Sequence, residues 1–403
     1  MSENLTFGDL KKAVSGAAAA FRSVTKLQPV EGEGGKAFPA TYSGGAYATE
    51  KRRLVDGPAV DGLSKEREVD CVLLDSVQSQ SNRAEEALKL AIERTQISLP
   101  LVEVDFSQAN EKLRSPLANL TTLDVPHRLA DAILRDSVLA DGTRFSKSEF
   151  AKRWGKSNLW NARAVYELCP TALVFGMWGS PEKPGGLGAK FERAFVSEIV
   201  AVDVERVEKR AGFRIDPLGA SKNVGIKLKD DGKFEVGSGK LKPSEINHGN
   251  IPYETSNGGI RFRYAEQVTV VSLGALRKLR FPANGADDPQ VNDAGRTVLA
   301  AIGLCAGVLA SETGTSLRSR CHLWPMGERV WELLEKPGQQ PRTFKINGEG
   351  ATSLLNEAAE AAKSVGLTWM EETLKLTPSP ELVELVRQSQ EFAAKEKGEG
   401  EAQ

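Results

Sequence analysis

The sequence has few of the residues that build metal centres and disulfide frameworks. Its 403 residues include only three histidines and four cysteines. The cysteines follow no C-x-x-C spacing, so we expect them to be reduced core thiols of a cytoplasmic protein; they are Cys71, Cys169, Cys305 and Cys321. So few histidines argue against a His-rich metal site. We therefore expect no metal ion and no cofactor.

Long hydrophobic runs are also absent. No segment approaches the roughly 20 apolar residues of a membrane-spanning helix, and the first residues lack the apolar core of a signal peptide. The composition, 40% hydrophobic and 27% charged, is ordinary for a globular protein. We expect a cytoplasmic protein with no membrane partner, built as one large domain with insertions or as two domains.

Neither sign of charge is in excess. The formal net charge is −1, which lowers the expectation of a free-standing nucleic-acid binder but does not exclude one whose basic groups line a single groove. Basic residues do cluster locally, although each cluster taken alone is most simply a solvated face. The clusters are Lys51-Arg52-Arg53, Arg128 with Arg135, Lys152-Arg153-Lys156, Arg261 with Arg263, and Arg277-Lys278-Arg280.

The most unusual stretch is the polar start of a helix predicted over residues 75–94. An apolar strand over 69–74 leads into it, and Asp75 with Gln78 forms a pattern like a capping box. A helix N-terminus suits a phosphate, and amides and hydroxyls bind sugar and phosphate without reading a base. The first turns therefore predict a platform for a nucleic-acid backbone, made by Gln78, Ser79, Gln80, Asn82 and Arg83.

Hydrophobic periodicity predicts the other elements. Helices are expected over 1–26, 125–139, part of 146–165, 274–281, 291–313, 350–365 and 380–395, and strands over 99–104, 171–179, 195–202 and 268–273. Strands interspersed with helices indicate an α+β sheet domain. Two loop-rich stretches, 27–68 and 211–260, read as insertions. The first contains Tyr42 and Tyr47, which argues against disorder and favours a loop or hairpin that projects from the body.

A glycine-rich loop at 176–193 invites comparison with phosphate-binding loops. It fits neither the P-loop pattern nor the dinucleotide pattern, because Lys190 lies between Ala189 and Phe191 and the third glycine is missing. A backbone-rich loop with Lys190 and Arg193 still suits a phosphodiester chain, and an ordinary long turn is the alternative. Nearby Trp178 is expected to be a packing residue, although an exposed aromatic there would stack on a base.

Four segments closely resemble one family: 72–83, 125–137, 173–178 and 242–252. They are similar to the RAMP-type backbone subunit of the CRISPR Cascade complex of type I-G, formerly called I-U. The likeness covers about residues 20–330. It implies a modified RRM-like (ferredoxin-like) palm over 1–330, with a thumb-like excursion at 27–68 and a loop-rich insertion at 211–260. A C-terminal helical region at 331–394 and a disordered tail at 395–403 are expected to follow.

The resemblance also implies roles for residues. The polar helix from Gln78 to Arg83 is expected to lie against the guide backbone, and the thumb candidates are Lys36, Tyr42, Lys51, Arg52 and Arg53. The remaining predicted RNA-binding residues are His127, Arg128, Lys190, Arg193, Asn247 and His248. In type III relatives an aspartate of the thumb loop cleaves RNA; here no motif marks Asp56 or Asp61 as catalytic, so we predict no catalytic residue.

The expected function is that of a non-enzymatic subunit that stacks head to tail along CRISPR RNA and displays the guide for antiviral defence. The expected partners are CRISPR RNA, target DNA through the guide, copies of the chain, other Cascade subunits and the recruited helicase-nuclease. One alternative is a RAMP-type endoribonuclease that processes precursor RNA with His127 or His248, although no pattern brings the histidines together. A second alternative is a scaffold that binds only proteins.

Overall fold

The computed structural model describes residues 3–60, 63–179, 189–207, 224–229, 232–237, 239–241, 258–283, 285–312 and 314–400. The predictions for Asp61, Asn247, His248 and most of the insertion at 211–260 lie outside these residues. The helices are α1 (Phe7–Ser15), α2 (Val77–Glu93), α3 (Ala132–Arg135), α4 (Glu149–Trp154), α5 (Arg163–Leu168), α6 (Thr171–Phe175), α7 (Leu273–Leu276), α8 (Pro289–Leu309), α9 (Gly348–Ser364) and α10 (Pro380–Gly400).

The strands belong to one large sheet and several small ones. They are β1 (Glu3–Asn4), β2 (Ala20–Pro29), β3 (Thr49–Val60), β4 (Leu63–Asp75), β5 (Val102–Val104), β6 (Leu120–Thr121), β7 (Ser137–Val138), β8 (Met177–Trp178), β9 (Lys190–Phe191), β10 (Phe195–Arg206), β11 (Ile226–Leu228), β12 (Phe234–Val236), β13 (Ile260–Ser272), β14 (Thr315–Arg318), β15 (Cys321–Pro325), β16 (Trp331–Leu334), β17 (Arg342–Lys345) and β18 (Leu374–Pro378).

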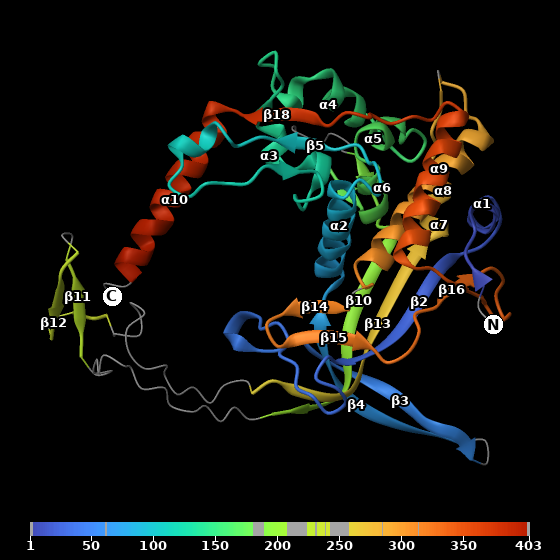
Figure 1. Cartoon of the computed structure of the whole chain (residues 1–403), viewed down its shortest axis with the longest axis horizontal. Helices are drawn as coiled ribbons and strands as arrows, with labels where there is room; N and C mark the ends of the chain where they lie inside the picture. Colours follow the sequence, from blue (N-terminus) through green and yellow to red (C-terminus); the bar gives the residue numbers. More distant parts are fainter. Residues whose placement is uncertain are drawn as a thin grey trace.

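The large sheet has the order β1-β17-β16-β2-β13-β10-β4-β3, and the β14–β15 pair joins it at β2 (Figure 1). Its centre has a ferredoxin-like arrangement. Along the chain, β2, α2, β10, β13, α8 and β16 follow one another, and the four strands lie in the order β16-β2-β13-β10 with every neighbour antiparallel. The predicted α+β, RRM-like fold is confirmed.

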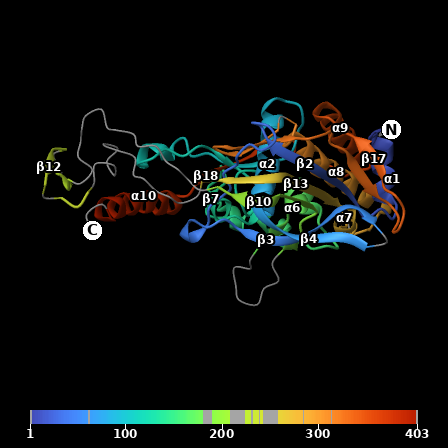
Figure 2. The same ribbon diagram turned by 90° about the horizontal axis from the view of Figure 1, so that it is seen from below.

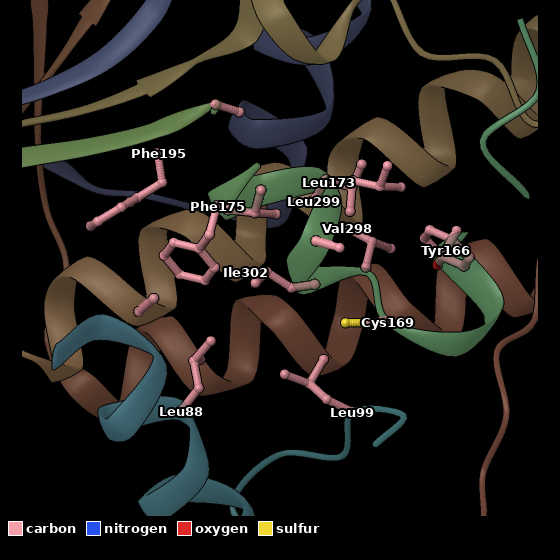
Figure 3. Packing of buried hydrophobic residues seen from close by; sticks show 14 of the residues in the cluster. Leu88, Leu99, Tyr166, Cys169, Leu173, Phe175, Phe195, Val298, Leu299 and Ile302 are labelled. Atoms are coloured by element: carbon pink, nitrogen blue, oxygen red, sulfur yellow. The ribbon is translucent and has the colours of Figure 1, made fainter. Parts of the chain in front are cut away.

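Helices α2 and α8 pack on one face of this sheet (Figures 1 and 2). Helix α8 is buried almost all round, as expected of a helix enclosed by other elements. A Cβ at Gly303 of α8 would lie 3.2 Å from the methyl groups of Val271 on β13, so the glycine lets helix and strand approach closely. Figure 3 shows Leu88, Phe175, Phe195 and Ile302 pointing into the shared core.

A belt of buried polar side chains crosses the helix-covered face of the sheet. Directly opposed residues of antiparallel strands share a face, and Ser197 pairs with Thr269, which pairs with Ser23. Above this belt lies an apolar cluster that includes Phe195 and Val271, and below it lies a second cluster that includes Ile199. The belt consists of Ser23, Thr25, Gln80, Ser197, Gln267 and Thr269, each at most 5% exposed.

A smaller sheet, of order β6-β5-β18-β7, lies beyond the C-terminal end of α2 (Figure 1). Strand β18 comes from the C-terminal part of the chain and pairs in parallel with β5. Helix α10 follows β18 and projects away from the body (Figure 1). None of the described helices combines the length and the apolar character needed to span a bilayer. All four cysteines are buried free thiols, as predicted.

Several predicted elements differ from the structure. The helix predicted over 1–26 is α1 followed by strand β2, because Ala20 and Phe21 pair with both β13 and β16. The helix predicted over 125–139 is only a 3₁₀ turn and the short α3. Arg128 adopts a left-handed φ of 52°, which a helix does not accommodate.

Two further corrections concern buried segments. The strand predicted over 171–179 is helix α6 followed by the two-residue strand β8; all five residues of α6 are buried. The region at 331–394 is not purely helical, since β16 and β17 extend the large sheet and β18 joins the small one. Helix α10 continues to Gly400, so the predicted disordered tail is wrong up to that residue.

The stretch 27–68, predicted to be a projecting loop or hairpin, contains β3 and the start of β4. Strands β3 and β4 pair in antiparallel fashion, and their far end extends beyond the body (Figure 1). Strand β4 then runs directly into α2, so the projecting hairpin and the polar helix are consecutive along the chain. This arrangement positions the first group of predicted RNA-binding residues.

Candidate nucleic-acid interface

The start of α2 is capped differently from the sequence prediction. The N-cap is Ser76, whose hydroxyl accepts from the backbone N–H of Ser79 at 3.3 Å. Asp75 lies in the strand instead, and its side chain is fully buried. Gln78 and Asn82, one turn apart, are exposed, and Ser79 is half-buried. These three polar side chains therefore form the accessible part of the predicted platform.

Gln80 and Arg83 serve the fold. Gln80 is 5% exposed; its amide nitrogen donates to Asp75 at 2.6 Å, and its amide oxygen accepts from Ser197 and Gln267 at 2.9 and 2.8 Å. Its position in the polar belt does not fit the predicted contact with a ligand. Because every polar atom of the Gln80 amide already has a partner, the side chain ties α2 to the sheet.

Arg83 is similarly engaged. Its guanidinium donates to the Asp75 carboxylate at 2.9 Å and to the backbone oxygens of Ser316 and Leu317 at 3.1 and 2.8 Å. The side chain is 28% exposed. Arg83 thus joins β4, α2 and β14, and its partners on β14 lie more than 200 residues away in the sequence, which no local pattern indicates.

Four other predicted residues converge at one pocket beside β8 and β9. Pro126, His127 and Arg128 form one wall, and β8 and β9 with Arg193 form the other. The volume is about 380 Å³. Among the described residues three cations line it and no carboxylate does; the described lining is Pro126, His127, Arg128, Phe175, Gly176, Met177, Trp178, Lys190, Phe191 and Arg193. We call this the cationic pocket.

Arg128 forms the back of the cationic pocket. It is 5% exposed, and its Nε and Nη2 atoms donate to the two carboxylate oxygens of Glu85 at 2.7 and 2.6 Å. A third hydrogen bond of 2.7 Å goes from Nη1 to the backbone oxygen of Gly176, and the guanidinium lies 5.4 Å from the ring centre of Phe175. Burial raises the pKa of Glu85, and Arg128 opposes that shift.

Arg193 is partly buried beside the Glu85–Arg128 pair. Its Nε atom donates to the backbone oxygen of Phe175 at 3.2 Å. Among the described residues Arg193 forms no ion pair with a carboxylate. The neighbouring Glu85 is paired with Arg128. Burial, and then the neighbouring Arg128, lowers the pKa of Arg193. Arg193 is therefore a cation in a partly desolvated place, which favours an added anion.

An acidic pocket of about 500 Å³ lies on the other side of the Glu85–Arg128 pair. Its carboxylates are Glu85, Glu86, Glu93 and Asp124, while Lys89 binds Asp124 at 2.8 Å. Asn82 and Pro126 also line it. Within the described part of the chain no cluster of ligands suits a metal ion. The carboxylates of this pocket disfavour a phosphate inside it.

The thumb candidates lie outside the cationic pocket. Lys51, Arg52 and Arg53 point from β3, and each pairs with a carboxylate: Lys51 with Glu68 at 2.6 Å, Arg52 with Glu50 and Glu266 at 2.5 and 3.6 Å, and Arg53 with Glu66 at 3.7 Å. Their charge is thus largely cancelled locally. Lys36 is half-buried and Tyr42 is 49% exposed, both in the loop before β3.

Trp178 is a functional candidate that the sequence prediction assigned to packing. It is 69% exposed, so that assignment is wrong. The alternation of a strand explains it, since neighbouring Met177 is buried and Trp178 faces out. The histidines do not form a catalytic pair among the described residues: His127 is exposed at the cationic pocket and His322 lies in β15.

The comparisons with known proteins concern this same part of the chain. Residues 21–206 match the model of a family described as CRISPR-associated protein GSU0053. No curated protein matches the chain. The matched residues include β2, the β3–β4 hairpin, α2 and the whole lining of the cationic pocket. The chain is therefore similar to this CRISPR-associated family in the segment that builds the candidate interface.

Proposed function

We propose that this chain is a CRISPR RNA-binding backbone subunit of a type I-G Cascade complex. It oligomerises head to tail along the guide RNA in the cytoplasm, catalyses no reaction itself and supports recognition of target DNA in antiviral defence. The observation that carries the proposal is the cationic pocket, whose lining in the described part of the chain has three cations and no carboxylate, inside the segment similar to a CRISPR-associated family.

The chemistry of the accessible groups supports backbone binding. Gln78, Ser79 and Asn82 offer neutral donors and acceptors at the start of α2, which suit sugar and phosphate oxygens. Lys190 and Arg193 add charge nearby. A neutral body with one cationic pocket suits a subunit that binds RNA as one of many copies, because base pairing supplies the specificity and the protein contacts shape and backbone.

Co-expression with a CRISPR array and the other Cascade subunits tests this proposal. We expect a high-mass complex holding one RNA of guide length, seen on a denaturing gel after size-exclusion chromatography. Replacing Gln78 and Asn82 together with alanine is expected to lower RNA occupancy equally for every guide. The matched control is Gln339→Ala, an exposed amide in the turn between β16 and β17.

Three results would contradict the proposal. One is a complex without RNA, which would favour the protein scaffold. The second is a loss in the double variant that depends on the guide sequence. The third is cleavage of precursor RNA by the purified chain that is abolished in His127→Ala, which would favour the endoribonuclease.

A further inference from the structure

Trp178 lines the cationic pocket from strand β8 while most of its surface faces solvent. It is 69% exposed, and large aromatic side chains are usually buried. Strands β8 and β9 fix its backbone by pairing Trp178 with Lys190 and Met177 with Phe191. A further hydrogen bond of 2.8 Å joins the N–H of Gly179 to the oxygen of Ala189. An aromatic surface fixed in this way loses little conformational entropy when it binds a ligand.

The strand beneath this side chain is anchored in the fold. The ring of Trp154 from α4 lies against Gly179, where an added Cβ would come within 3.2 Å of it. Met177 and Phe191, the neighbours of Trp178 and Lys190, are both 4% exposed. The β8–β9 pair therefore presents one exposed ring and one cation to solvent, with buried side chains on its other face.

A cation lies over the ring of Trp178. The Nζ atom of Lys190 is 5.2 Å from the centre of the Trp178 ring, within reach of a cation–π interaction. Arg193 lies across the same pocket and has no carboxylate partner among the described residues. The pocket volume of about 380 Å³ falls within the range of roughly 300–1,000 Å³ typical of small-ligand sites.

We infer that the cationic pocket binds one unpaired nucleotide of a single strand, with its base stacked on Trp178 and its phosphate held by Arg193 and Lys190. This inference rests on the proposed function and deepens it, because it assigns base stacking to a surface otherwise proposed to contact only the backbone. A base has a π-face whatever its identity, so stacking of this kind is compatible with any guide. The nucleotide belongs either to the guide RNA or to a displaced DNA strand.

Binding of the full-length, nucleic acid-free chain to fluorescent oligonucleotides tests the inference. The probes are an oligouridylate of about 12 nucleotides, within the site sizes of single-strand binding folds, its DNA counterpart and a version with abasic riboses. We expect Trp178→Ala to weaken binding of the oligouridylate at least about 5-fold and to leave binding of the abasic probe unchanged. We expect Trp178→Phe, which keeps an aromatic ring, to retain most of the affinity. The control is Trp160→Ala, another tryptophan, 77% exposed and outside the pocket lining.

Arg193→Gln is expected to weaken binding of both the base-bearing and the abasic oligonucleotide. It is also expected to reduce the slope of log K against log salt by about 0.7. A second measurement uses the wild-type chain alone. Oligouridylate carrying 4-thiouridine is expected to crosslink on irradiation to the peptide that contains Trp178. This readout does not depend on the folding of any variant.

The outcomes separate the inference from the proposed function. If guide RNA co-purifies with Trp178→Ala and the variant binds oligouridylate as the wild type does, the inference fails while the function stands. If no guide RNA co-purifies but the DNA probe binds in a Trp178-dependent way, the function fails and the nucleotide site stands with DNA as its source. Crosslinks that map only outside the pocket would overturn the inference.

Discussion

Arg128 holds both carboxylate oxygens of Glu85, at 2.6 and 2.7 Å, and both side chains are buried. This pair joins the segment before α3 to the middle of α2. It also separates the cationic pocket from the acidic one, since Glu85 lines the acidic pocket and Arg128 lines the cationic pocket. One ion pair therefore fixes both the packing of α2 and the sign of charge on each side.

Replacing Arg128 with methionine is expected to lower the free energy of unfolding by about 3–5 kcal/mol near neutral pH, because it leaves a buried carboxylate without its partner. Glu85 already has a raised pKa through burial, and losing Arg128 removes the opposing effect. A group whose pKa is higher in the folded than in the unfolded state stabilises the fold fully at pH values below its unfolded-state pKa. That stabilisation is lost as the pH rises through its folded-state pKa. Urea unfolding at about pH 7 and about pH 5 measures the change.

The double variant Arg128→Met with Glu85→Gln is the control. It lacks the titrating carboxylate, so it is expected to be more stable than Arg128→Met near neutral pH. The difference between the two variants should shrink as the pH falls toward the ordinary glutamate pKa of about 4.3. A difference that stays constant with pH would show that Glu85 is not the cause of the instability.

Gly176 shapes the cationic pocket through its backbone. Its φ is 85°, and an added Cβ would lie 3.1 Å from Cγ of Arg193. Gly176→Ala is therefore expected to cost about 1–2 kcal/mol of stability for the left-handed conformation alone, to displace Arg193, and to weaken binding of both base-bearing and abasic oligonucleotides. Chemical unfolding and fluorescence anisotropy measure the two effects.

Gly142→Ala is a matched control for this substitution. Gly142 has a similar φ of 80°, but an added Cβ would meet no atom within 4 Å. Both glycines have a positive φ that favours glycine, while the contact with Arg193 is missing at Gly142. We expect the control to lose stability and to keep its affinity for RNA. Equal losses of affinity in both variants would mean that the displacement of Arg193 does not matter.

The sequence allowed prediction of elements that are long or strongly periodic. The buried helix α8, the amphipathic α9 and the strand β10 lie where the apolar pattern indicated, whereas β13 was predicted only over its last residues. Helix α6 was predicted as a strand because a short apolar run that is buried all round has the same appearance in either conformation. The left-handed φ of Arg128 gave no local signal, so a continuous helix was predicted there.

The candidate site was predicted only in part, because local spacing does not show long-range packing. Sequence spacing places Gln78, Gln80 and Arg83 on one short stretch of helix but does not show which side faces the sheet. The partners that bury Gln80 and Arg83 come from β10, β13 and β14, far along the chain. The cationic pocket likewise depends on β8 and β9 pairing beside His127, a long-range relationship that no single segment contains.

The charge balance of the β3–β4 hairpin gives a final prediction. Lys51 pairs with Glu68 on the neighbouring strand at 2.6 Å, and the hydrogen bond that Lys51 donates to the Glu68 carboxylate raises the pKa of Lys51. Glu68→Gln keeps the size of the side chain and removes the charge that pairs with Lys51. If the hairpin lies along RNA, the variant is expected to bind the oligouridylate more tightly at low salt, with a slope of log K against log salt steeper by about 0.7 for one added phosphate contact.

The matched control for Glu68→Gln is Glu149→Gln, which releases Lys152 from an ion pair of the same 2.6 Å length on α4. Helix α4 lies at the opposite end of the molecule from the hairpin (Figure 1). Both pairs are exposed, so neither substitution is expected to change stability measurably. A steeper salt dependence in Glu68→Gln alone assigns the RNA path to the hairpin. The same change in both variants would reflect only net charge. If Glu68→Gln changes nothing, the hairpin is not part of the interface, and the cationic pocket and the start of α2 hold the strand.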